Sequence, residues 1–476
     1  MLNFGLTMVP NQLDPVECWN YQQFLMIQAV YDTLVRVDEN GRLVSGLAKK
    51  WHVNESGTTY TFFLDSNAKF HNGMSPNSED VAFSIARHLW PDSKSVVKNY
   101  LIDLLVGAEN LKTSAIPSGI KIEKPDQISL TISKPYPPFL FVLAMPGFSI
   151  VPKNVDFKKG PIGSGPMTAK FLENEATWVF ERFPSFSGTK PKAQKICIKR
   201  TPSLNDVLDG FKNQSLDVAI GPPFSELDGQ QLPTHVTAVA TNSLVTCHLI
   251  VNKNKGPLSK LDFRRDLASL FYSLAEKKEN LSKFQDFEPT YIPKGVMPKQ
   301  YYDKAIPRFD LSSFKAKYAG KEPIHIVLLA SYFKKEFLDA LDKLFVESGL
   351  NVKFDKITNQ EFGAVFAKGD FDVLSLPYIG NFPDPDGFLE ALRTGDKLKD
   401  WAPGKQLFEE IDKIRHTANA TTRLAQYSTV LQKFEGEWFV IPLFRVSLPI
   451  LHREGIKIPE TNYRYEANLR HIFWEK

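Results

Sequence analysis

Apolar residues in the first third of the chain change their spacing several times, which predicts a series of short elements. Apolar positions that recur every three or four residues favour helices, and β-branched or aromatic runs favour strands. The pattern predicts a strand over Asn3–Val9, a helix over Tyr21–Val35, a strand over Thr58–Leu64, a helix over Glu79–Leu89 capped by Asn77 or Ser78, and two strands within Ile120–Ile132.

The second half of the chain alternates strand and helix patterns more regularly. The pattern predicts a strand over Ile324–Leu329, a helix over Lys334–Ser348, a strand over Val352–Ile357, a helix over Gln360–Lys368, a strand over Phe371–Leu376, a mostly helical stretch over Leu407–Phe434, and a strand over Phe439–Phe444. This alternation favours an α/β layer with a largely parallel sheet. No apolar run reaches the ~18 residues that a membrane-spanning helix needs.

Two clusters rich in proline and glycine interrupt the pattern. Pro135-Tyr136-Pro137-Pro138 cannot continue a strand, because proline lacks the backbone N–H. The cluster Gly160–Pro166 predicts a major loop and a domain boundary. With 476 residues the chain is too long for one ordinary core, and a prior of roughly 150 residues per domain predicts two to three domains.

Composition and charge narrow the classes of function. Hydrophobic residues make up 43% of the chain and charged residues 24%, which is typical of a folded globular protein. The formal net charge is +4 and the basic residues are scattered, so no nucleic-acid partner is expected. The 36 Phe, 15 Tyr and 7 Trp are enough to line a binding cavity as well as to fill a core.

Recognisable catalytic and metal-binding motifs are absent from the sequence. Gly163-Ser164-Gly165 is too short for a nucleophile elbow. The nine histidines are far apart, so neither a metal site nor a cofactor is expected. Cys18, Cys197 and Cys247 leave two alternatives open: one disulfide with one free thiol, or three free thiols. We therefore expect a protein that is not an enzyme and has no catalytic residues.

Dispersed motifs connect these elements to a known family. In chain order they are Leu13-Asp14-Pro15, Val30-Tyr31-Asp32-Thr33-Leu34-Val35, Gly46-Leu47-Ala48-Lys49-Lys50-Trp51, Tyr60-Thr61-Phe62-Phe63-Leu64, Phe70-His71-Asn72-Gly73, Glu79-Asp80-Val81-Ala82-Phe83-Ser84, Ile162-Gly163-Ser164-Gly165-Pro166, Asp370-Phe371-Asp372-Val373, Asp384-Pro385-Asp386-Gly387-Phe388-Leu389 and Ile441-Pro442-Leu443-Phe444. Their order and spacing resemble those of the family 5 solute-binding proteins of bacterial ABC importers, which include oligopeptide-, dipeptide- and nickel-binding proteins. The resemblance covers nearly the whole chain.

The resemblance implies an α/β fold of the periplasmic-binding-protein type II class, with two α/β lobes, a hinge and an extra α+β domain. Lobe I would comprise residues 1–37, 155–245 and 440–476, the extra domain residues 38–154, and lobe II residues 246–439. Two crossover strands would form the hinge, and the lobes would close around a ligand. His71 would be a structural residue of a turn in the extra domain.

The resemblance also implies a ligand site built from two short stretches. The first follows the first Asp-Pro and holds Trp19, Asn20 and Tyr21. Aromatic rings can stack on a ligand and an amide can donate and accept hydrogen bonds, while ordinary core packing is the alternative for these residues. The second stretch holds Tyr378, Gly380, Asn381 and Asp384.

Asn381 occupies the position at which dipeptide-binding members hold the ligand's ammonium with an acid. Burying an ammonium without a counter-charge costs on the order of several kcal/mol, more than the ~1 kcal/mol that a hydrogen bond to an amide returns. We therefore expect a neutral or N-blocked solute, unless Glu17 or Asp384 turns into the cavity.

Two further residues have competing interpretations. Asp386 is expected as the N-cap of a helix over Gly387–Arg393. His248 lies where the chain would enter lobe II and is a candidate ligand residue, with a packed or hinge-surface histidine as the alternative.

These features predict a substrate-binding protein of an ABC transporter, which captures a peptide-like or other small polar solute and delivers it to a membrane permease. The alternative is a ligand-sensing domain that reports to a receptor or a transcription regulator. The first residues lack the pattern of a secretory signal, so the chain is either cytosolic or has lost its export signal. The resemblance implies a periplasmic or lipid-anchored extracytoplasmic protein, and we expect a monomer.

Overall fold

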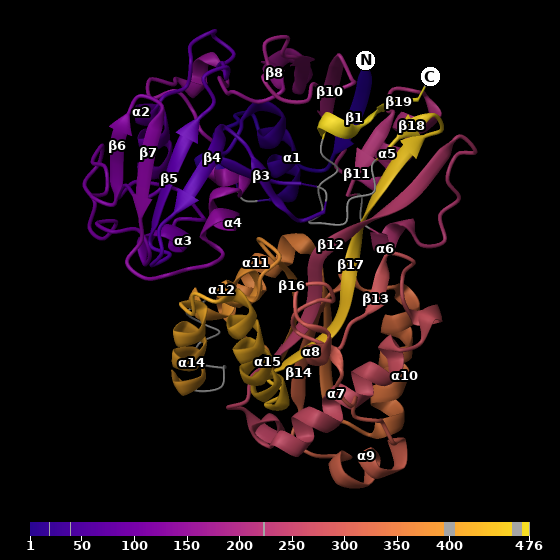
Figure 1. The fold of residues 1–476 in the computed structure, drawn as a ribbon. Helices are drawn as coiled ribbons and strands as arrows, with labels where there is room; N and C mark the ends of the chain where they lie inside the picture. Colours follow the sequence, from indigo (N-terminus) through magenta and orange to yellow (C-terminus); the bar gives the residue numbers. More distant parts are fainter. Residues whose placement is uncertain (19, 39, 222–223, 395–404, 459–468, 476) are drawn as a thin grey trace.

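One mixed sheet of eleven strands runs through both lobes (Figure 1). The computed structural model describes residues 1–476 except 19, 39, 222–223, 395–404, 459–468 and 476. From one edge to the other the order is β15 (Val352–Ile357), β14 (Ile324–Leu329), β16 (Val373–Ile379), β12 (Val236–Val251), β17 (Val440–Arg453), β11 (Val218–Ile220), β1 (Leu2–Leu6), β10 (Lys195–Arg200), β9 (Thr177–Arg182) and β8 (Met167–Leu172), and β13 (Gln285–Phe287) pairs with β17.

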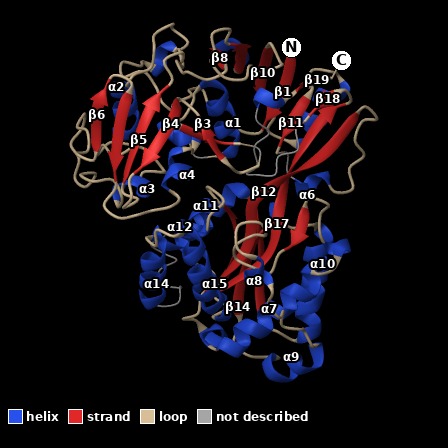
Figure 2. Cartoon of the chain, in the orientation of Figure 1, coloured by secondary structure: helices blue, strands red, loops and turns tan. Residues whose placement is uncertain are grey.

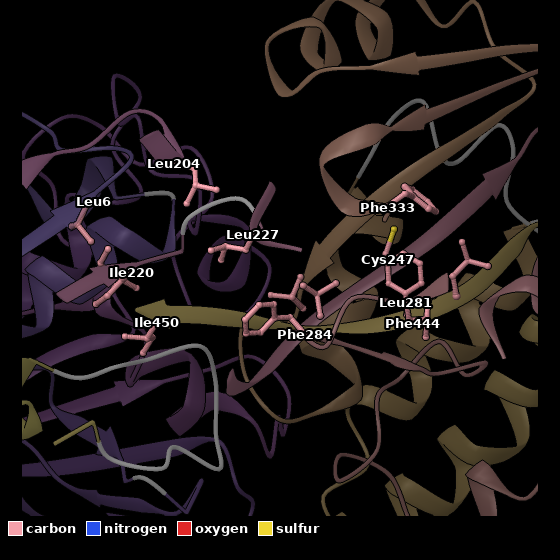
Figure 3. Packing of buried hydrophobic residues seen from close by; sticks show 14 of the residues in the cluster. Leu6, Leu204, Ile220, Leu227, Cys247, Leu281, Phe284, Phe333, Phe444 and Ile450 are labelled. Carbon is pink, nitrogen blue, oxygen red and sulfur yellow. The ribbon is translucent and has the colours of Figure 1, made fainter. Parts of the chain in front are cut away.

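The two long strands at the centre of this sheet connect the lobes. β12 and β17 pair in antiparallel fashion, with a shift of register between Thr241 and Val245. Ser243 lies in this irregular stretch, and its hydroxyl donates to the carbonyl of Val446. One core cluster continues on both sides of the irregularity and includes Leu6, Ile220, Ile450, Cys247, Phe333 and Phe444 (Figure 3). A local break in a ladder that is otherwise packed on both sides is where a sheet bends most easily.

Lobe II contains the parallel strands that the sequence predicts. β14 pairs in parallel with β15 and with β16, and β16 pairs antiparallel with β12. The helices flank this part of the sheet (Figure 2). They are α7 (Leu261–Ala275), α8 (Lys299–Tyr302), α9 (Leu311–Tyr318), α10 (Lys335–Ser348), α11 (Asn359–Lys368), α12 (Pro385–Thr394), α14 (Lys405–Arg415) and α15 (Ala420–Gly436). The predicted alternation over residues 324–376 is confirmed.

In lobe I, the first strand of the chain lies inside the sheet. β1 is parallel to both of its neighbours, β10 and β11, and β9 and β8 continue the sheet in antiparallel fashion. The helices of this lobe are α1 (Tyr21–Val30), α5 (Leu204–Lys212) and α6 (Phe224–Leu227), and β18 (Ile456–Lys457) pairs with β19 (Phe473–Trp474) near the end of the chain. Helix α1 follows the carboxyl end of β1, the edge at which α/β sheets bind ligands.

The extra domain has its own sheet and its own core. The strand order is β4 (Ala48–Val53), β5 (Thr59–Leu64), β7 (Gln127–Thr131) and β6 (Ile120–Lys124), all antiparallel, and β2 (Val35–Val37) pairs with β3 (Leu43–Ser45). Its helices are α2 (Ser78–Ala86), α3 (Asn99–Ile102) and α4 (Phe139–Leu143). A capping box between Asn77 and Asp80 begins α2, so Asn77 is the N-cap. The buried apolar cluster comes from residues 34–150 with one addition from lobe II, Phe382.

The predicted helix over Tyr21–Val35 is too long. Helix α1 ends at Val30, and Tyr31 is extended with its hydroxyl donating to the carbonyl of Leu13 at 2.7 Å. The apolar spacing continues past Val30 because Leu34 and Val35 enter the core of the extra domain, not that of lobe I. The apolar spacing therefore predicted correctly that Leu34 and Val35 are buried, but wrongly that they belong to the helix.

No disulfide joins the three cysteines, all of which the structure describes; Cys18 and Cys247 are buried and Cys197 is partly buried. This settles the alternative that the sequence left open. Across the described residues, no helix combines the length and the apolar character that crossing a bilayer requires.

Candidate ligand-binding site

The first predicted stretch lies at the N-terminus of α1. Asn20 is the N-cap, and its side-chain oxygen accepts from the backbone N–H of Gln23 at 3.0 Å. Its amide nitrogen is buried and has no hydrogen-bond partner among the described residues, so this donor remains to be satisfied. The Tyr21 hydroxyl lies 3.4 Å from the carbonyl of Gly221, and burial raises the pKa of Tyr21. Trp19 lies outside the described residues.

A residue that the sequence did not single out holds this stretch in place. Gln22 is 1% exposed, and its carbonyl oxygen accepts from the Met8 backbone N–H at 2.7 Å and from the Thr7 hydroxyl at 3.1 Å. Its amide donates to the carbonyl of Ile220 and to the Tyr21 hydroxyl, each at 3.1 Å. Gln22 therefore ties the ends of β1 and β11 to α1. Its place inside an apolar helix was the signal that could have revealed it.

The Asp-Pro motif before α1 anchors the same stretch to the extra domain. The Asp14 carboxylate accepts from the backbone N–H of Val16 at 3.0 Å and pairs with Arg87 at 2.5 Å. Glu17 pairs with Lys94 at 3.0 Å, and both side chains are exposed. The Glu17 carboxylate is thus turned to an exposed cation of the extra domain.

The second predicted stretch comprises the end of β16, with Tyr378, and the loop between β16 and α12. A Cβ on Gly380 would lie 2.3 Å from the ring of Phe388, so this position requires glycine for packing. Asn381 donates from its side-chain amide to the hydroxyl of Tyr100 in the extra domain, at 2.7 Å. Tyr100 is 3% exposed, and burial raises its pKa, with the nearby hydroxyl of Tyr378 adding to the effect. The loop thus brings Tyr378, Asn381 and Tyr100 together.

Asp384 and Asp386 are engaged inside lobe II. Asp384 is 8% exposed and forms two parallel hydrogen bonds to the guanidinium of Arg423. Its carboxylate also accepts from the backbone N–H of Asp386 at 3.1 Å. The expectation that Asp386 is the N-cap is wrong, because α12 begins at Pro385 and the capping bond comes from Asp384. Asp386 instead accepts from the Tyr427 hydroxyl at 2.5 Å and lies 3.4 Å from Arg415.

His248 lies in the interior of lobe II, on β12 and opposite Leu376 of β16. It is 2% exposed, its ring stacks on that of Tyr291 at 4.8 Å between centroids, and its Nε2 lies 2.8 Å from the hydroxyl of Thr246. Burial lowers the pKa of His248 to about 3, so the ring is neutral at physiological pH. The Tyr378 hydroxyl donates to the carbonyl of Gly387 at 3.0 Å.

The side chains of the two predicted stretches can bind a solute through hydrogen bonds and stacking by neutral groups. Within the described parts of the chain, no three His, Cys, Asp or Glu side chains gather closely enough to hold a metal ion. The amides of Asn20 and Asn381 and the hydroxyls of Tyr21, Tyr100 and Tyr378 supply neutral donors and acceptors. Such a set suits a polar, uncharged group better than a buried ion.

Known proteins resemble the chain along nearly its whole length. It is 26% identical over 458 residues to the probable D,D-dipeptide-binding periplasmic protein DdpA of Escherichia coli, covering 90% of this chain and 84% of that protein. It is 23% identical to the nickel-binding periplasmic protein of Escherichia coli, covering 89% and 85% respectively.

Solved structures share the fold. NikA from Brucella suis in complex with Fe(III)-EDTA superposes with a TM-score of 0.82 at 20% identity, covering 100% of this chain and 99% of that one. DppA from Helicobacter pylori in complex with the peptide STSA gives a TM-score of 0.80 at 16% identity, covering 100% and 98%. The sequence profile of bacterial extracellular solute-binding proteins, family 5, matches residues 42–400. The chain therefore belongs to the family 5 extracellular solute-binding proteins of bacteria, the substrate-binding components of ABC transporters.

Proposed function

We propose that this solute-binding protein captures a peptide-like or other small polar solute that has no free ammonium group, and passes it to a membrane permease. The lobes proposed to close on it are residues 1–37, 155–245 and 440–476 on one side and residues 246–439 on the other, with residues 38–154 as the extra domain. The separate apolar cluster of residues 34–150 and the break in β12 support this division.

The observation that carries the proposal is the environment of Asn381. Its amide nitrogen already donates to Tyr100, so the side chain offers a neutral carbonyl oxygen where an ammonium would need a carboxylate. The nearby carboxylate of Asp384 is matched by Arg423, and that of Glu17 by Lys94. An unpaired ammonium enclosed here would lose several kcal/mol of hydration. The same site would accept an acylated nitrogen at little cost.

We assign different roles to the predicted residues. Asn20, Tyr21, Tyr378 and Asn381 would contact the solute, together with Tyr100. Asp384, Gly380 and His248 would hold the walls, because each is committed to neighbours within lobe II. Solved relatives have been captured with the peptide STSA and with agropinic acid, so the fold serves peptides and other small solutes.

Calorimetric titration tests the charge preference directly. A mixed tripeptide library and its fully N-acetylated counterpart are titrated separately into the protein after it has been unfolded, dialysed and refolded. We expect the acetylated library to bind at least about tenfold more tightly than the free library, since 1.4 kcal/mol corresponds to a factor of ten. Tighter binding of the free library would refute the proposal.

A further inference from the structure

The loop after β16 reaches out of lobe II and into the core of another domain. Phe382 is 1% exposed, and its ring packs against Tyr100 at 5.6 Å between centroids with an interplanar angle of 63°. Every other buried member of the cluster that contains Phe382 comes from residues 34–150. A lobe II side chain thus completes the core of the extra domain.

The loop that carries Phe382 is held in place by hydrogen bonds and close packing within lobe II. The backbone N–H of Gly380 donates to the carbonyl of Leu244 at 3.0 Å. The backbone N–H of Asp384 donates to the carbonyl of Phe382 at 2.8 Å. A Cβ on Gly387 would lie 2.4 Å from the same carbonyl oxygen, so the turn is packed against the start of α12. With Asp384 fixed by Arg423, the loop has little freedom to swing Phe382 aside.

A second contact joins the same two bodies at the end of α14. The Arg415 guanidinium lies over the ring of Tyr136 at 5.1 Å, and the Nδ1 of His416 lies 3.1 Å from the carbonyl of Pro135. Arg415 is held from the lobe II side by Asp386 at 3.4 Å. Pro135 and Tyr136, at the start of the Pro135–Pro138 cluster, thus contact the end of α14.

We propose that Phe382 is a latch between lobe II and the extra domain, with Arg415 and His416 as a second fastening point. In the closed arrangement the ring is buried among extra-domain residues, and opening the lobes must withdraw it into water. The latch stabilises closure without touching the solute. It therefore raises affinity for every solute by the same factor, because only the closed form holds the solute.

This inference rests on the closure proposed above, but its test needs no solute. Fluorophores are placed on cysteines that replace Lys121 in the extra domain and Lys413 on α14, in a Cys197→Ser background, since Cys18 and Cys247 are buried. Single-molecule energy transfer then gives the ratio of closed to open molecules after refolding without solute. Burial of a phenyl ring corresponds to a roughly 10- to 100-fold change in that ratio.

The variants separate the latch from general damage. Phe382→Ala should lower the closed-to-open ratio about 10- to 100-fold. Tyr100→Phe keeps the ring contact and loses only the hydrogen bond to Asn381, so it should lower the ratio about two- to tenfold. Phe354→Ala is the matched control, because this half-buried ring packs on Phe345 within lobe II. Circular dichroism confirms that each variant is folded.

The closed-to-open ratio of Phe382→Ala, compared with that of Phe354→Ala, either supports or overturns the latch. A loss of the closed population in Phe382→Ala that Phe354→Ala does not share supports the latch. A ratio for Phe382→Ala within twofold of the control overturns it, as does a wild-type protein with no detectable closed population. If Phe382→Ala fails to fold, Phe382→Leu decides, because it stays apolar but loses the ring contact with Tyr100: a ratio within twofold of the control overturns the latch. Failure of the preference for acylated solutes would leave these populations unaffected.

Discussion

The two stretches that flank the proposed site are held by opposite means. In lobe I, neutral hydrogen bonds centred on Gln22 fix the N-terminus of α1. In lobe II, buried ion pairs fix the loop after β16, with Asp384 on Arg423 and Asp386 near Arg415. A buried neutral group that loses its hydrogen-bond partner costs about 1–3 kcal/mol, whereas a buried charge that loses its partner costs about 3–5 kcal/mol. The lobe II wall is therefore the more vulnerable of the two.

The largest effect is expected from Arg423→Ala. The substitution leaves the Asp384 carboxylate, which is 8% exposed, without its cation. We expect the free energy of unfolding in urea to fall by about 3–5 kcal/mol. The double variant Asp384→Ala with Arg423→Ala should lose less than the sum of the two single changes. A loss below about 1 kcal/mol for Arg423→Ala would show that this wall does not depend on charge.

Gln22→Ala tests the lobe I side of the comparison. It leaves the Met8 N–H and the Ile220 carbonyl without their side-chain partner in a site where Gln22 is 1% exposed. We expect a loss of about 2–3 kcal/mol in the same urea measurement. If this loss equalled or exceeded that of Arg423→Ala, the contrast between the two lobes would be broken.

Acid should weaken lobe II through His248. Burial lowers its pKa to about 3, below the value of about 6.5 in an unfolded chain, so the unfolded state binds the proton first. The stabilisation is fully present above pH 6.5 and is lost as the pH falls toward 3. At pH 5 the loss is about 2 kcal/mol. His248→Gln should flatten the fall in unfolding free energy between pH 6.5 and 5, and an unchanged slope would contradict the assignment.

Two glycines of lobe II offer the smallest and most closely matched test. Gly380→Ala drives a Cβ to 2.3 Å from the Phe388 ring, and we expect a loss of about 1–2 kcal/mol in thermal unfolding. Gly363→Ala, inside α11, meets nothing within 4 Å and should gain about 0.5–1 kcal/mol. Equal effects from the two substitutions would show that the loop is not tightly packed.

Local patterns predicted the parallel strands of lobe II, because burial on a sheet follows sequence spacing directly. The motifs likewise located the loop that holds Asn381. Spacing could not show that Leu34 and Phe382 enter the core of the extra domain, since partners between bodies leave no periodic trace. It also could not separate Asp384 from Asp386 as the capping residue, because both stand beside Pro385. The sequence alone does not show which residues far apart in the chain pack against each other.

In the proposed function, Asn381 makes the site one for solutes without a free ammonium group. The most direct test exchanges that charge with Asn381→Asp and repeats the titrations of free and N-acetylated tripeptides. We expect the wild type to prefer the acetylated form, and the variant to gain at least about tenfold in affinity for the free form relative to the acetylated one. A ratio of the two affinities that does not respond to the exchange would contradict it.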